Sequence, residues 1–130
     1  MLAFRKAVEA HDMAAAEAAL ADDVVFTSPV AFKPYAGKPV TAAILRAVSE
    51  VFGDFRYVRE TTSTDGRDHA LVFTAKVGDR EITGCDFLHL NEAGLIDDLM
   101  VMVRPLSAAQ ALAAEMGARF ERIGREAAAG

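Results

Sequence analysis

The stretch that decides the fold is Ile82-Thr83-Gly84-Cys85-Asp86-Phe87-Leu88-His89-Leu90. Its side chains alternate as they do in a strand of an antiparallel sheet that has one buried face. The alternation places Asp86 on the same face as Leu88 and Leu90. A buried carboxylate costs several kcal/mol unless it is paired or protonated. We therefore predict that Asp86 is either held by a partner or used in a site.

The turns on either side of this strand predict the neighbours of Asp86. A two-residue turn at Gly78-Asp79 places Leu71 opposite Asp86, and a four-residue loop over 91–94 places Leu99 opposite it on the other side. No cation is present among these neighbours, so burial is expected to raise the pKa of Asp86. A neutral carboxylic acid can donate a hydrogen bond to a ligand oxygen. The alternative is that Asp86 accepts bonds from a helix end or a loop and serves structure alone.

The rest of the chain divides at about residue 53, where the apolar period changes from about 3.6 to 2. Short hairpin turns after this point predict a four-stranded antiparallel meander, and the fold class is therefore α+β. The predicted elements are a helix from about residue 4, a short helix capped by Asp12, a strand over 24–27, a loop over 29–38, a helix from Pro39 that ends at Gly53, strands over 55–63, 69–77, 80–90 and 95–104, and a last helix over 107–125 with Ser107 as its N-cap.

The hairpin at Asp65-Gly66 allows two registers. A two-residue turn directs one set of side chains inward, and a three-residue turn with a bulge directs the other. The first set is Arg56, Val58 and Glu60. The second set is Phe55, Tyr57 and Arg59, which gives the more apolar interior and is favoured here.

Composition narrows the class of protein. The chain has 130 residues, 52% of them hydrophobic, which predicts a single globular domain over 1–130. A net charge of −5 without a basic run argues against nucleic acid and anionic membranes as partners. The single cysteine, Cys85, and the absence of a signal-peptide or membrane-spanning pattern favour a cytoplasmic protein. No His, Asp or Glu cluster has the spacing of a metal site, and we expect neither a metal nor a cofactor.

Three stretches carry a resemblance to a known family. They are Ala21-Asp22-Asp23-Val24-Val25-Phe26-Thr27-Ser28-Pro29, Tyr35-Ala36-Gly37-Lys38 and Cys85-Asp86-Phe87-Leu88-His89-Leu90-Asn91-Glu92-Ala93-Gly94. With the element order, they resemble the nuclear transport factor 2-like superfamily, which includes the SnoaL-like polyketide cyclases and the ketosteroid isomerases. The resemblance covers about residues 2–106. It implies a cone in which a curved antiparallel sheet wraps around N-terminal helices, with a C-terminal helix added.

The resemblance also implies roles for single residues. Ketosteroid isomerases have a proton-shuttling Asp where this chain has Ser28, and an oxyanion-hole Tyr where it has Phe4. Their neutral Asp on the third meander strand matches Asp86. Because a serine cannot abstract a carbon-bound proton unaided, steroid isomerase activity is not expected. The Asp-Arg-Asp set of the epoxide hydrolases related to this fold is also incomplete, since Gly84 occupies the position of its Arg.

A cone of this fold implies an apolar pocket with Asp86 as its polar anchor. We expect it to bind a small hydrophobic molecule of polyketide, steroid or terpenoid type. Two alternatives stay open: an isomerase, cyclase or dehydratase that uses Asp86 as general acid or base, and a non-catalytic dimeric scaffold. The predicted lining residues are Phe4, Phe26, Ser28, Tyr35, Phe52, Tyr57, Phe73, Asp86, Leu99 and Val101.

The opposite face of the predicted sheet is also apolar, which is costly in a monomer. We predict that it forms a homodimer interface, and His89 falls on this outer face. The alternative is that the C-terminal helix folds back over it. Asp97 is placed on the Asp86 face, near the turn. The predicted interface residues are Val72, Phe87, Met100 and Met102.

Overall fold

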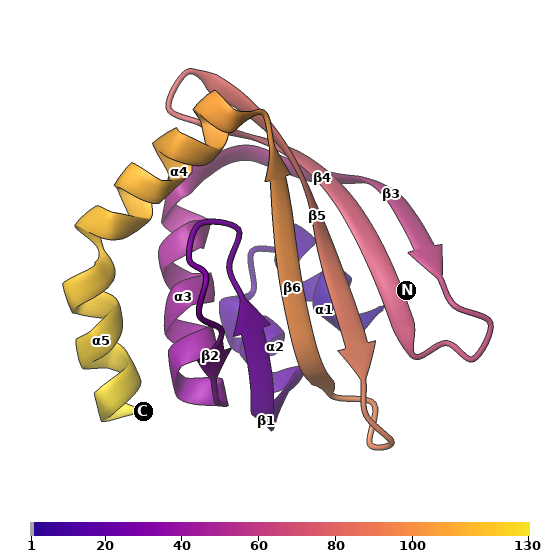
Figure 1. The fold of residues 1–130 in the computed structure, drawn as a ribbon. Helices are drawn as coiled ribbons and strands as arrows, with labels where there is room; N and C mark the ends of the chain where they lie inside the picture. The colour runs from indigo at the N-terminus through magenta and orange to yellow at the C-terminus, as the bar shows by residue number, and fades with distance from the viewer. Residues whose placement is uncertain (1) are drawn as a thin grey trace.

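Four antiparallel strands form the predicted meander in a computed structural model that describes residues 2–130 (Figure 1). A strand near the N-terminus extends the sheet by pairing parallel to the last meander strand. The sheet order is β2-β1-β6-β5-β4-β3. The strands are β1 Leu20–Thr27, β2 Tyr35–Ala36, β3 Phe52–Thr62, β4 Asp68–Val77, β5 Arg80–Leu90 and β6 Ile96–Arg104.

Helices cover the inner face of this curved sheet, which confirms the α+β cone (Figure 1). Asp12 caps the second helix as predicted, since its Oδ1 accepts from the Ala15 N–H at 3.1 Å. The third helix ends at Val51, before the predicted stop at Gly53, because Phe52 already has extended backbone angles and begins β3. Gly53 is therefore a strand residue. The helices of this part are α1 Ala3–Glu9, α2 Met13–Ala18 and α3 Lys38–Val51.

The C-terminal segment differs from the single helix predicted over 107–125. It forms two helices, α4 Leu106–Ala118 and α5 Phe120–Ala129, with a bend at Arg119. Ser107 is not the N-cap, because Leu106 is already helical and Pro105 precedes it in extended conformation. No side chain caps α4.

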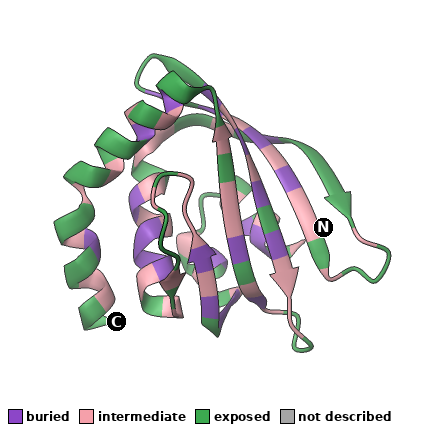
Figure 2. Ribbon diagram, in the orientation of Figure 1, coloured by how far each residue is buried: buried purple, intermediate pink, exposed green. Residues whose placement is uncertain are grey.

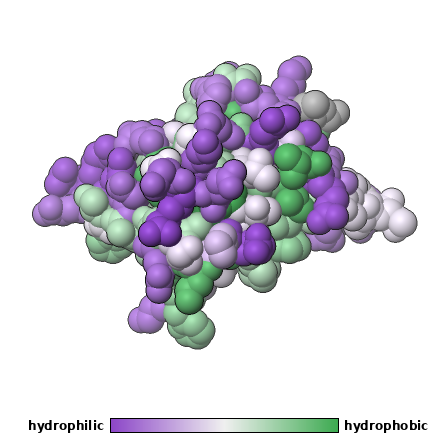
Figure 3. All heavy atoms as spheres, turned by 90° about the horizontal axis from the view of Figure 1, so that it is seen from above, coloured by the Kyte–Doolittle hydropathy of each residue, from purple (hydrophilic) through white to green (hydrophobic). Residues whose placement is uncertain are grey.

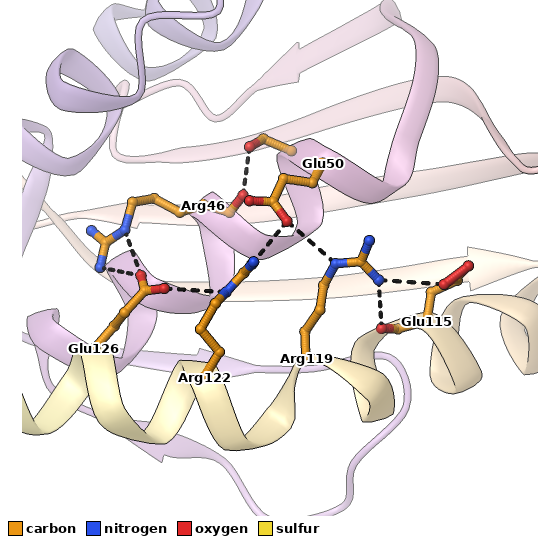
Figure 4. A network of polar contacts seen from close by, with 7 residues as sticks. Arg46, Glu50, Glu115, Arg119, Arg122 and Glu126 are labelled. Carbon is orange, nitrogen blue, oxygen red and sulfur yellow. Dashed lines mark hydrogen bonds and ion pairs between the residues drawn. The ribbon is translucent and has the colours of Figure 1, made fainter.

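Ion pairs fasten α5 to α3 (Figure 4). Arg46 of α3 pairs with Glu126 at 3.0 Å, and Arg122 of α5 pairs with Glu50 at 2.8 Å. Arg46 also contacts Glu17 of α2. These contacts explain why the helix continues to Ala129 instead of ending near residue 125.

The register between β4 and β5 is the predicted one, with Leu71 opposite Asp86. Between β5 and β6 the prediction is wrong by two residues, because Val101 and not Leu99 lies opposite Asp86. Two features cause the shift. Asn91 and Leu95 are hydrogen-bonded at 2.8 Å, so the loop has one residue fewer than expected. A bulge follows at residue 97.

That bulge also changes the face of Asp97. Its Oδ1 lies 2.7 Å from His89 Nδ1, so the two side chains meet on the outer face. The prediction that Asp97 shares the face of Asp86 is therefore wrong.

The hairpin between β3 and β4 has neither of the two predicted turns. The Ser63 N–H donates to the Asp68 carbonyl at 2.8 Å, which leaves a four-residue loop over 64–67. A bulge between Tyr57 and Arg59 then changes which side chains face inward. Phe55 and Tyr57 lie against the core as favoured, whereas Arg59 is exposed.

No helix within residues 2–130 covers the outer face of the sheet. Side chains of α4 reach the inner cavity and α5 packs on α3, so the alternative in which the C-terminal helix covers the outer face is wrong. Phe87 is 37% exposed and Met102 is 53% exposed. Buried and exposed residues alternate along the strands (Figure 2), and the face seen from above is mostly hydrophilic (Figure 3).

None of the helices in residues 2–130 has both the length and the apolar composition needed to cross a membrane.

Candidate functional site

A cavity of about 130 Å³ lies between the inner face of the sheet and the helices. A void that holds one water needs about 10–15 Å³, so this cavity is much larger than a single-water site. Its walls are mainly aliphatic and aromatic. The rings of Phe55 and Phe73 stack with centroids 4.9 Å apart, and Tyr57 meets Phe55 edge to face at 5.0 Å. These contacts fix the wall on the β3–β4 side.

Asp86 is the one carboxylate among the lining residues in the described part of the chain, and its side chain is buried. The Tyr57 hydroxyl donates to its Oδ2 at 2.7 Å. Within residues 2–130, Oδ1 has no hydrogen-bond partner. Burial raises the pKa of Asp86 from 3.8 to about 6, and the bond from Tyr57 opposes this shift without cancelling it.

Tyr57 remains a phenol under all ordinary conditions. Burial raises the pKa of Tyr57 first, and the adjacent negative charge of Asp86 raises it further. The guanidinium of Arg5 lies 5.7 Å from the centre of the ring and is itself paired with Glu60 at 2.9 Å. Tyr57 is thus a permanent hydrogen-bond donor, and Asp86 is the group in this pair that gains and loses a proton.

The alternative partners proposed for Asp86, a helix end or a loop, are not found in the described residues. The partner is a side chain two strands away. Tyr57 pairs with Phe73 on β4, and Asp86 pairs with Leu71 on the same strand, so the phenol crosses β4 to reach the carboxylate. The sequence placed Tyr57 on the cavity wall without indicating this bond. Two features of the sequence could have indicated the Tyr57–Asp86 bond: the inward register of β3 and the length of a tyrosine side chain.

Most of the predicted lining residues do meet at the cavity, and ligand contact by them stays a prediction. Tyr35 is the exception, because it packs beside Phe26 with ring centroids 6.4 Å apart and does not line the cavity. Ser28 lies on the lining with its Oγ accepting from the Val30 N–H at 3.1 Å. The residues that do line the cavity are Phe4, Phe26, Ser28, Phe52, Tyr57, Phe73, Asp86, Leu99 and Val101.

Several lining residues lie outside that set. Ile44 and Val48 belong to an apolar helical stripe that the sequence shows, but that stripe does not say which members border a void. His11 and the α4 residues depend on tertiary packing. The additional lining residues include His11, Met13, Ile44, Leu45, Val48, Phe55, Leu112 and Met116.

Gly84 is required by the aromatic wall. A Cβ at this position would lie 2.3 Å from the tip of the Phe73 ring, well inside van der Waals contact. Phe73 therefore occupies the space that a side chain at residue 84 would need. Gly84 is also the residue that, in the family resemblance described above, stands at the arginine position of the epoxide hydrolases.

No group of three or more His, Cys, Asp or Glu side chains suited to a metal ion occurs in residues 2–130. The polar side chains on the cavity lining are the carboxyl of Asp86, the phenol of Tyr57, and the side chains of His11, Ser28 and Ser49.

Comparisons place this geometry in a family. Residues 1–99 match the SnoaL-like domain model. The chain is 45% identical to a steroid delta-isomerase from Pseudomonas aeruginosa, with a TM-score of 0.85 over 90% of this chain and 85% of that chain.

Two further solved structures show the same fold. An uncharacterised bacterial protein with a cystatin-like fold from Silicibacter pomeroyi is 38% identical, with a TM-score of 0.88 over 95% of this chain and 86% of that chain. A putative polyketide cyclase from Pseudomonas putida is 20% identical, with a TM-score of 0.65 over 82% of this chain and 89% of that chain. No curated protein matches the chain. The chain belongs to the SnoaL-like domain family and has the nuclear transport factor 2-like fold.

Proposed function

We propose that the cavity binds a small apolar molecule that places one hydrogen-bonding oxygen against Asp86. The observation that carries this proposal is the unpartnered Oδ1 of a buried carboxyl group on the wall of an apolar cavity. Ligand sites are typically apolar with a small number of polar groups that fix orientation. Tyr57 holds Oδ2 in place, so Oδ1 is oriented before a ligand arrives.

The pKa of Asp86 decides which oxygen it prefers. Above about pH 6 the group is a carboxylate and accepts from a hydroxyl, and below this value it is an acid that donates to a carbonyl. We therefore expect phenols to bind best at pH 7.5 and ketones to gain affinity at pH 5. The names of two relatives, a steroid delta-isomerase and a putative polyketide cyclase, agree with an apolar ring compound as ligand.

Binding of 2-naphthol and naphthalene tests this proposal, because the two differ by one hydroxyl. At pH 7.5 we expect 2-naphthol to bind about 10- to 100-fold more tightly, the range for a hydrogen bond to a charged group. Asp86→Asn should remove most of that preference while naphthalene binding is kept. Asp97→Asn is the matched control, since it removes the carboxylate of the outer-face pair and should change neither affinity. Equal binding of both probes by the wild-type protein contradicts the proposal.

A second candidate function is acid–base catalysis by Asp86 in an isomerase, cyclase or dehydratase. The observation that favours it is the pKa of about 6, close to the pH at which such a group works best. Ser28, at the base position of the ketosteroid isomerases, carries no carboxylate, so proton transfer from carbon has Asp86 as its base here. The 45% identity to a steroid delta-isomerase keeps this function open despite the changes at Phe4 and Ser28.

Deuterium exchange separates catalysis from binding. In D₂O at pH 7.5, a catalytic Asp86 should exchange the acidic carbon-bound protons of 2-tetralone about 10²- to 10⁴-fold faster than the Asp86→Asn variant does. NMR follows the loss of the proton signals. Exchange no faster than that of Asp86→Asn, in a protein that binds 2-tetralone, leaves the binding function and removes the catalytic one.

We further propose that a second copy of the chain covers the outer sheet face, through Val72, Phe87, Met100 and Met102. The exposed fractions of Phe87 and Met102, with none of the helices in residues 2–130 over them, support this arrangement. Met102→Glu should convert a dimer to a monomer in light scattering without changing 2-naphthol affinity. A wild-type monomer, or an unchanged dimer in this variant, contradicts the interface.

A further inference from the structure

His11 follows α1 in a backbone conformation that is unusual for a residue with a side chain. Its φ is 56°, in the left-handed region. The His11 N–H donates to the Val8 carbonyl at 3.1 Å, and the Asp12 N–H donates to the Ala7 carbonyl at 2.9 Å. These two bonds form a Schellman motif, in which glycine is the usual residue at this position. This chain has a histidine at the position, although glycine fits the left-handed backbone better.

The side chain of His11 lies at the open end of the cavity. His11 lines the cavity and is exposed, whereas Asp86 lines it and is buried, so the cavity extends from a deep carboxyl group to a solvent-facing imidazole. Within residues 2–130 neither ring nitrogen of His11 has a hydrogen-bond partner. Val30 is another lining residue that is exposed, at 39%.

The polar groups at the two ends differ in chemistry. Ser28, which is half-buried on the lining, uses its oxygen to accept from the Val30 N–H, which leaves its hydroxyl hydrogen free to donate. Ser49 has no free hydrogen, because it donates to the Arg46 carbonyl at 2.6 Å. The cavity lining therefore carries two hydrogen-bond donors, the exposed His11 and the half-buried Ser28, while the buried carboxylate of Asp86 is an acceptor above about pH 6.

We propose that His11, with Ser28, forms a rim subsite that binds a carboxylate or another acceptor oxygen at the outer end of the ligand. The ligand class is then a small ring compound with a hydroxyl at one end and a carboxylate at the other. This inference rests on the proposed function and makes it more specific. The carboxylate binds at the rim and not at depth, because Asp86 repels a second negative charge there.

Three phenols test the rim subsite at pH 6.5: 2-naphthol, 6-hydroxy-2-naphthoic acid and 3-(6-hydroxynaphthalen-2-yl)propanoic acid. The last two place the carboxylate at different distances from the hydroxyl. We expect at least one of them to bind about fivefold more tightly than 2-naphthol, the gain of a partly exposed charge-assisted bond. The protein carries a net charge of −5, so general electrostatics would give the opposite result.

The variant His11→Gly tests whether His11 causes the gain in affinity of the carboxylate probes over 2-naphthol. Glycine fits the left-handed backbone, so this variant should fold and melt no lower than the wild type. The ratio of carboxylate affinity to 2-naphthol affinity, about five for the best carboxylate in the wild type, should fall to about one in this variant. His11→Asn, which also tolerates this conformation, should lose the gain as well.

His89→Gln is the control, because it removes an imidazole from the outer face and should keep the gain. A carboxylate gain that persists in His11→Gly, or that is absent from the wild type, overturns the rim subsite and leaves the deep site intact. Failure of 2-naphthol itself to bind is a different result, which overturns the proposed function and the subsite together.

Discussion

Strand β5 contributes to two polar pairs that have the same length and opposite surroundings. On the inner face Asp86 meets Tyr57 at 2.7 Å, and on the outer face His89 meets Asp97 at 2.7 Å. The inner pair is buried in an apolar wall, whereas the side chains of the outer pair are 41% and 30% exposed. Distance alone therefore does not describe what either pair does.

Solvent access decides whether the charged form is disfavoured or favoured in each pair. Burial raises the pKa of Asp86 and disfavours the charge, although a donor stands beside it. At His89 the hydrogen bond to Asp97 raises the pKa of the imidazole and favours the charge. The inner pair therefore costs stability at neutral pH and holds a group ready for use, whereas the outer pair contributes weakly to structure.

The largest expected effect is on the pH dependence of folding. The folded-state pKa of Asp86 is raised from 3.8 to about 6, so the folded protein keeps a proton that the unfolded chain releases. The free energy of unfolding should therefore fall as pH rises from about 4 to about 6, by about 3 kcal/mol, and stay lower above this range. Urea denaturation at pH 4.5 and 7.5 should show about 2 kcal/mol of this fall, because at pH 4.5 the unfolded chain has already released most of this proton.

The isosteric Asp86→Asn variant should not show this fall in the free energy of unfolding, and it should be more stable than the wild type at pH 7.5. Asp97→Asn should show the same fall as the wild type. The same pH slope in Asp86→Asn and in the wild type contradicts this account of the inner pair.

The second effect concerns the packing that excludes water from the inner pair. Gly84→Ala should destabilise the protein by about 1–3 kcal/mol, because the added Cβ meets the Phe73 ring at 2.3 Å. Thermal and urea unfolding measure it. Gly124→Ala on α5 is the matched control, since nothing lies within 4 Å of its added Cβ and helix propensity favours alanine. Equal stability of the two variants shows that the aromatic wall is loose.

Tyr57→Phe should have a third, smaller effect that depends on pH. It removes the donor to Oδ2 and should cost about 1–2 kcal/mol at pH 7.5, where Asp86 is a carboxylate. At pH 4.5 the neutral acid loses less, so the cost should shrink. Loss of the donor also raises the pKa of Asp86 above its wild-type value. A cost that is equal at both pH values indicates lost packing and no charge-dependent bond.

The smallest effect is expected on the outer face. Because Asp97 raises the pKa of His89, the pair stabilises the protein below the ordinary histidine pKa and loses its contribution as pH rises through the raised value. Asp97→Asn should lower the pKa of His89 in an NMR titration and change stability less than any variant above. A change as large as that of Tyr57→Phe contradicts the contrast between the two faces.

Local signals in the sequence account for the fold. Alternation over 80–90, the turn at Gly78-Asp79 and the Asp12 cap each act within a few residues, and the structure confirms them. The errors come from features that local patterns do not encode. A bulge at residue 97 moved the partner of Asp86 from Leu99 to Val101, and contacts with α3 extended the last helix.

The candidate site shows the same division. Asp86 was identifiable because a charged residue interrupts an apolar face, and the direction of its pKa followed from burial. The hydrogen bond from Tyr57 to Asp86 could not be identified from the sequence. It joins strands that are two apart in the sheet and depends on the bulge in β3. The role of His11 at the rim depends on how α1 ends and on what lies across the cavity, which no periodicity indicates.

The central claim is that Asp86 is a buried carboxyl group, hydrogen-bonded by Tyr57, with a pKa raised to about 6. A carbon-13 NMR titration of its side-chain carboxyl in the free protein, assigned by comparison with Asp86→Asn, tests this claim directly. We predict a midpoint of about 6, moving higher in Tyr57→Phe. A midpoint at or below about 4, the ordinary value of an aspartate, contradicts a pKa raised to about 6, because the carboxylate would then be solvated or paired with more than Tyr57.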